Sequence, residues 1–72
     1  MNVYPVLDLA NNYLKIFRGG NSVAFEDCLH GGYGTPTAYV SGNTVVVQYS
    51  NGCRDEYYFN DEGLYEGHQF IG

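Results

Sequence analysis

Two cysteines and two histidines are the residues of this sequence best suited to metal or nucleophilic chemistry: Cys28, His30, Cys53 and His68. Such a set satisfies tetrahedral zinc, and a metal would stabilise the small core of a 72-residue chain. The spacing does not match that of known zinc sites. A zinc knuckle has two cysteine ligands with about two to four residues between them, whereas one residue separates Cys28 from His30, and Cys53 and His68 are isolated. We therefore predict no metal and no other cofactor, with the thiols buried and the histidines on the surface.

The two cysteines have two alternative roles, a disulfide or catalysis. A Cys28–Cys53 disulfide would stabilise the fold by ~2–4 kcal/mol. The N-terminal residues lack a secretory pattern, which favours the cytoplasm and reduced thiols. A cysteine–histidine catalytic pair needs a thiolate, which the neighbouring carboxylates of Glu26 and Asp27 would disfavour. We therefore predict a cytoplasmic protein that is not an enzyme, with a metal- or thiol-dependent enzyme as the last alternative.

The acidic residues gather in the second half of the chain. The formal net charge is −5, of which residues 1–36 contribute −1 and residues 37–72 contribute −4. Such a surface repels nucleic-acid phosphates and attracts basic protein surfaces. Residues 54–66 contain five acids and three tyrosines, and tyrosine is enriched in protein interfaces. The residues that we predict to contact a partner are Asp55, Glu56, Tyr58, Asp61, Glu62, Tyr65 and Glu66.

These residues predict a protein-binding module that uses an acidic, tyrosine-rich hairpin to block a basic, nucleic-acid-binding surface of a partner. In size and acidity the chain is similar to phage-encoded inhibitors such as anti-CRISPR and anti-restriction proteins, which would place it in the host cytoplasm. The alternative is a small structural or assembly subunit, or a homodimer, joined through exposed strand edges. We expect no direct contact with nucleic acid and none with a membrane, since the longest aliphatic run is too short to span a bilayer.

Residues 5–18 have the spacing of an amphipathic helix. One face of a 3.6-residue period would carry Val6, Leu9, Ala10, Tyr13 and Phe17, and Pro5 and Gly19 suit the first position and the C-terminal cap. The alternative is a hairpin of Val3–Leu9 and Tyr13–Arg18 that turns at Asn11-Asn12. Residues 22–30 fit either a second short helix, which would bury Val23, Phe25, Cys28 and Leu29, or an irregular loop.

The remaining residues indicate four β-strands separated by turn residues: Thr37–Val40, Thr44–Tyr49, Cys53–Phe59 and Leu64–Ile71. The fragment Gly31-Gly32-Tyr33-Gly34 that precedes them lacks the Lys-Ser/Thr of a phosphate-binding loop and is interpreted as a flexible connector. The sequence thus predicts one α+β domain over residues 1–72, in which an N-terminal helix packs on a four-stranded antiparallel β-meander.

The register of the central hairpin follows from its turn, Ser50-Asn51-Gly52. A three-residue loop with Gly52 in the left-handed conformation pairs Tyr49 with Cys53 and Val45 with Tyr57. This register keeps the apolar residues on one face, with Asp55 as the exception, and puts Arg54, Glu56 and Tyr58 on the opposite face.

Overall fold

A computed structural model describes residues 3–72 of the protein, and this part of the chain is all-β, with no helix. The predicted α+β fold, with an N-terminal helix packed on a β-meander, is therefore wrong. Residues 3–72 instead form two antiparallel sheets with seven strands: β1 (Val3–Asp8), β2 (Tyr13–Arg18), β3 (Ser22–Cys28), β4 (Pro36–Ser41), β5 (Thr44–Tyr49), β6 (Arg54–Phe59) and β7 (Tyr65–Ile71).

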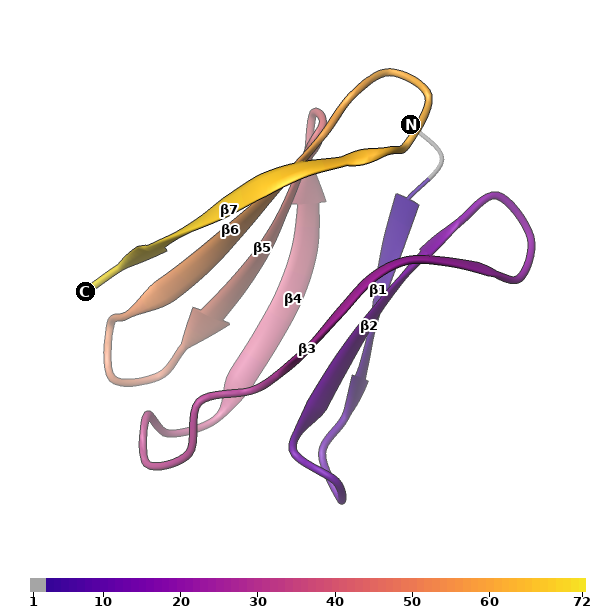
Figure 1. Ribbon diagram of the computed structural model, residues 1–72. Helices are drawn as coiled ribbons and strands as arrows, with labels where there is room; N and C mark the ends of the chain where they lie inside the picture. The colour runs from indigo at the N-terminus through magenta and orange to yellow at the C-terminus, as the bar shows by residue number, and fades with distance from the viewer. Residues whose placement is uncertain (1–2) are drawn as a thin grey trace.

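The two sheets face each other as two layers (Figure 1). Sheet A contains β1, β2 and β3 in that order, and sheet B contains β4, β5, β6 and β7 in that order. At one side of the sandwich β1 lies against β4. At the other side an aromatic pair joins β3 to β7, because Phe25 stacks on Tyr65 with 3.9 Å between the ring centroids. Each sheet therefore has an inner face on the shared core and an outer face.

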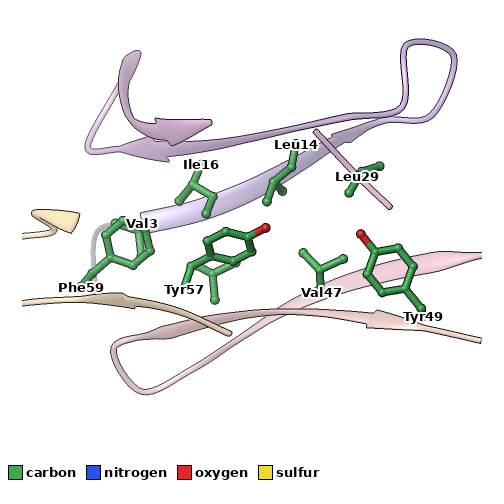
Figure 2. Close-up of a cluster of buried hydrophobic side chains, with 9 residues drawn as sticks. Val3, Leu14, Ile16, Leu29, Val47, Tyr49, Tyr57 and Phe59 are labelled. Carbon is green, nitrogen blue, oxygen red and sulfur yellow. The ribbon is translucent and has the colours of Figure 1, made fainter. Parts of the chain in front are cut away.

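Apolar side chains from both sheets fill the space between the layers (Figure 2). Leu14 and Ile16 of β2 are fully buried and point toward the side chains of β5 and β6. The other members of this core are Val3, Leu29, Val45, Val47, Tyr49, Tyr57 and Phe59. A sheet of three or four strands needs a packed face to be stable, so each sheet depends on burial against the other.

The C-terminal meander confirms the strands predicted from the sequence, with boundaries shifted by at most one residue. The predicted register is also confirmed, since Val45 pairs with Tyr57 and the Tyr49 N–H donates to the Cys53 carbonyl at 2.8 Å. Gly52 has a φ of 97°, as the bulged turn requires.

We expect Gly52→Val to lower the free energy of unfolding by at least ~1 kcal/mol, because a branched side chain is strained at positive φ. A Cβ at this position would meet no atom within 4 Å, so the cost is conformational rather than steric. Gly20→Val is the matched control, since Gly20 also has open space and its φ is not positive. Urea denaturation followed by circular dichroism measures both, and equal stabilities would contradict the bulged turn.

Residues 5–18 form the hairpin that the sequence offered as the alternative to a helix. The turn is held by Asp8, whose carboxylate accepts hydrogen bonds from the backbone and the side-chain amide of Asn11 at 3.2 and 2.8 Å. Asn12 follows with a φ of 54°, a conformation that Asn tolerates. Pro5 lies on β1, an edge strand, where its missing N–H removes no essential bond.

The helical interpretation failed because burial in this segment follows a period of two. Val6 and Leu9, which the helix would bury, are 45% and 60% exposed, whereas Leu14 and Ile16 have no exposed surface. Alternate residues of a strand point to opposite faces of its sheet, so the inner face of sheet B selects one set for burial. The spacing of the apolar residues is compatible with the helical period of 3.6 and with the strand period of two. Packing against sheet B selected the strand.

Residues 22–30 are neither a helix nor a loop, because Ser22–Cys28 form β3 along β2. A register shift between Ile16 and Phe17 accommodates one extra residue of β3. Of the side chains expected to be buried here, Leu29 is buried and Phe25 is half-buried, whereas Val23 and Cys28 are exposed. No helix that could cross a membrane occurs in residues 3–72.

Candidate functional site

The residues predicted to contact a partner do not share one surface. Because β6 alternates, Asp55 lies on the inner face of sheet B while Glu56 and Tyr58 lie on its outer face. Tyr65 of β7 also points inward, where it stacks on Phe25. The other three predicted residues are exposed, with Asp61 and Glu62 in the β6–β7 turn and Glu66 on β7. The structure thus removes Asp55 and Tyr65 from the candidate surface. The other five predicted residues remain on the outside of the molecule.

On the outer face of sheet B, Glu56 is engaged by its own neighbours. It forms an ion pair with Arg54 at 2.9 Å and accepts a hydrogen bond from the Tyr58 hydroxyl at 2.9 Å. The hydrogen bond from Arg54, assisted by that from Tyr58, lowers the pKa of the Glu56 carboxyl. Glu56 is therefore an anion whose charge Arg54 largely offsets.

The acids of the β6–β7 turn are held differently. The Asn60 side chain accepts hydrogen bonds from the backbone N–H groups of Glu62 and Leu64 at 2.9 and 3.0 Å, which fixes the turn. The Asp61 carboxylate accepts a hydrogen bond from Asn43 at 2.7 Å, which is a neutral partner. These three acids are exposed, and no ion pair within residues 3–72 involves Asp61, Glu62 or Glu66.

On the inner face, Asp55 is buried and binds His30 from the segment that joins the two sheets. The His30 Nε2 lies 2.9 Å from an Asp55 carboxylate oxygen, and the His30 backbone N–H donates to the Tyr49 hydroxyl at 2.9 Å. The imidazole stacks on Tyr33 with 4.8 Å between ring centroids. Burial raises the pKa of Asp55, and the nearby His30 opposes that rise. This pair attaches the connecting segment to sheet B.

Tyr57 lies at the centre of the aromatic side chains between β3 and β7. Its ring lies 5.7 Å from that of Phe25 and 5.1 Å from that of His68, and its hydroxyl donates to Asp27 at 3.4 Å. Burial raises the pKa of Tyr57 well above the usual range for tyrosine. Because the contacts with Phe25 and Asp27 cross from sheet B to sheet A, they hold the two layers together on this side.

Neither of the two cysteines is buried, so the prediction of two buried thiols is wrong. Cys28 is exposed on β3 and Cys53 is half-buried, and both thiols are free. Within residues 3–72 no group of three or more His, Cys, Asp or Glu residues could hold a metal ion. The glycine-rich segment is tied to the β5–β6 turn, since the Thr35 N–H donates to the Ser50 hydroxyl at 2.8 Å and the Asn51 N–H to the Tyr33 carbonyl at 3.1 Å.

One exposed surface was missed by the sequence reasoning, the outer face of sheet A. Tyr4, Val6 and Val23 are exposed there, and Tyr4 stacks on Phe17 with 5.4 Å between ring centroids. Beside them is an open hollow of about 510 Å³, lined by Val6, Leu7, Asp8, Leu9, Lys15 and Phe17. In the hairpin that the sequence offered as an alternative, successive side chains point to opposite faces, which would have placed Tyr4, Val6 and Asp8 together on this face.

Comparisons with protein-family models, with curated proteins and with solved structures found no match for this chain.

Proposed function

We propose that this protein is a protein-binding module that engages a basic surface of a partner through the exposed acids of the β6–β7 hairpin. The observation that carries the proposal is the exposure of Asp61, Glu62 and Glu66, which form no ion pair within residues 3–72. Arg18 lies at this turn, where its Nε donates to the Glu62 carbonyl at 2.8 Å, and its single positive charge is outnumbered by the three acids. Arg54 lies opposite Ile71 at the far end of the hairpin and pairs with Glu56. The surplus negative charge at this end of sheet B favours a cationic partner.

The mechanism that this surface suits is steric and electrostatic. The partner's Lys and Arg side chains would meet the hairpin carboxylates in place of nucleic-acid phosphates, as in a phage-type inhibitor that blocks a nucleic-acid-binding groove in the host cytoplasm. Tyr58 adds aromatic area on the adjoining outer face, where its hydroxyl is already held by Glu56. The role requires binding alone, so the proposal includes no catalytic step and no cofactor.

The experiment is charge reversal measured against a captured partner. Affinity capture from host cells identifies the partner, and surface plasmon resonance then compares the protein with its Glu62→Lys variant and with Asp61→Lys/Glu62→Lys. We expect the double reversal to weaken binding at least ~10-fold, mainly through the association rate, because exposed carboxylates steer encounter but contribute little to folding. Binding by the unchanged protein is expected to weaken steeply between ~50 and ~300 mM salt.

The matched control is Glu26→Lys, which makes the same charge change on the outer face of sheet A. It is expected to retain most of the affinity, and an equal loss in both single variants would show that only net charge matters. Tyr58→Ala is expected to speed dissociation with little dependence on salt. Unchanged affinity after the double reversal, with nucleic acid failing to compete for the partner, would refute the proposal.

A further inference from the structure

The outer face of sheet A presents a regular three-by-three arrangement of side chains, set by the pairing of its strands. One row is apolar, the second has a lysine at its centre, and the third is mixed. The register gives the rows as Tyr4, Phe17 and Val23; then Val6, Lys15 and Glu26; then Asp8, Tyr13 and Cys28. Exposed apolar groups gathered in this way mark an interaction surface.

The charges of this face are of both signs and lie close together. Lys15 occupies the central position, directly across from Glu26 on β3 and diagonal to Asp8 on β1. Within residues 3–72 Lys15 forms no ion pair, and the Glu26 carboxylate accepts a single hydrogen bond, from the Tyr13 hydroxyl at 2.7 Å. A surface with this pattern is complementary to itself, whereas the strongly basic partner of the acidic hairpin would meet Lys15 with like charge.

We propose that the outer face of sheet A binds a second copy of this chain, face to face, about a two-fold axis that runs parallel to the strands, between β2 and β3. Such an axis lays β2 of one copy over β3 of the other and keeps the apolar rows together, so that Phe17 of each copy meets Val23 of the other. It also brings Lys15 of each copy beside Glu26 of the other.

The size of the face indicates how strong this association is. With ~4.8 Å between strands and ~3.3 Å per residue, three strands of six or seven residues cover on the order of a few hundred Å². A stable interface buries about 800 Å² per partner, so the dimer belongs to the weak class that forms and dissociates readily. This differs from edge-to-edge strand pairing, which the sequence offered as the route to a homodimer and which would leave the outer face exposed.

The test is sedimentation velocity of the full chain from ~10 μM to ~1 mM, a range chosen for weak interfaces. The average mass is expected to rise with concentration from the 8.0 kDa of the monomer toward twice that value. Val23→Glu places a charge in the apolar row and is expected to weaken association at least ~10-fold. Leu64→Glu is the matched control, since Leu64 is equally exposed (46% against 44%) outside this face, and it is expected to associate like the unchanged protein.

A charge exchange distinguishes this face from any other route to a dimer. Lys15→Glu is expected to weaken association, and Lys15→Glu/Glu26→Lys to restore it, because the exchanged pair is again complementary to itself. Circular dichroism confirms that each variant is folded, and Val23→Ser replaces Val23→Glu if the latter unfolds. A protein that stays monomeric at ~1 mM would overturn the proposal, and so would a dimer that both Val23→Glu and Lys15→Glu leave intact.

Discussion

Replacing Tyr57 with alanine is expected to lower the free energy of unfolding by about 3–5 kcal/mol, the usual cost of truncating a buried aromatic side chain. Tyr57 is 1% exposed and touches Phe25 of the other sheet and His68 of its own. A domain of 72 residues has about 4–11 kcal/mol of stability in total, at ~0.05–0.15 kcal/mol per residue. We therefore expect Tyr57→Ala to be largely unfolded near 37 °C, as measured by urea and thermal denaturation.

The control is Tyr57→Phe, which keeps the ring and removes only the hydroxyl that donates to Asp27 at 3.4 Å. A long hydrogen bond of this kind is worth at most ~1 kcal/mol, so Tyr57→Phe is expected to stay folded. If Tyr57→Ala were as stable as Tyr57→Phe, the aromatic contacts between β3 and β7 would not hold the layers together.

Replacing His30 with alanine is expected to destabilise the fold by about 1–3 kcal/mol at neutral pH, because it leaves the carboxylate of Asp55 buried without its partner. Breaking a fully buried ion pair costs about 3–5 kcal/mol, and the lower range follows from the exposure of the His30 side chain, which is 40%. The substitution also removes the ring that stacks on Tyr33 and so loosens the segment between the sheets.

The loss caused by His30→Ala should depend on pH in a defined direction. Burial raises the pKa of Asp55 above its ordinary value of 3.8, so the ionised carboxylate costs stability as the pH rises through the raised pKa. His30 opposes that rise, and without it the cost at neutral pH is larger. The difference in unfolding free energy between the protein and His30→Ala is therefore expected to shrink as the pH falls toward ~4, where the Asp55 carboxyl becomes protonated.

A double variant separates charge from packing in this prediction. In His30→Ala/Asp55→Asn the buried group is neutral, so much of the stability lost in His30→Ala should return, and its dependence on pH should disappear. A pH-independent loss in His30→Ala, with no recovery in the double variant, would mean that His30 acts through stacking alone.

The local sequence specified the C-terminal meander because each of its signals pointed to the same structure. Ser50-Asn51-Gly52 fixed the turn and its left-handed glycine, and the alternation along β6 then fixed which residues face the core. The one polar residue on the apolar face, Asp55, was also placed correctly by that register. Such agreement between turn chemistry and side-chain period makes a strand assignment secure.

The N-terminal half was different because its signals conflicted. Pro5, Asp8 and the apolar spacing of residues 6–17 satisfied the rules for a helix, and only Asn11-Asn12 pointed to a turn. The inner face of sheet B resolved the conflict, since it offered Leu14 and Ile16 complete burial against Tyr57 and Val47. Residues 22–28 then became a strand because β2 provided an edge to pair with.

The candidate surfaces also depend partly on local sequence and partly on tertiary packing. Composition and charge identified an acidic hairpin, and its turn residues Asp61 and Glu62 are exposed as that interpretation requires. Only the packing of sheet A on sheet B decided that Asp55 turns inward to His30 and Tyr65 to Phe25, because these contacts join residues far apart in the chain. By itself the sequence determined the meander, its register and the excess of negative charge, since turn chemistry, alternation and charge are local properties. The tertiary structure decided the fold of residues 3–28 and the apolar outer face of sheet A, since burial there depends on which surface a strand meets.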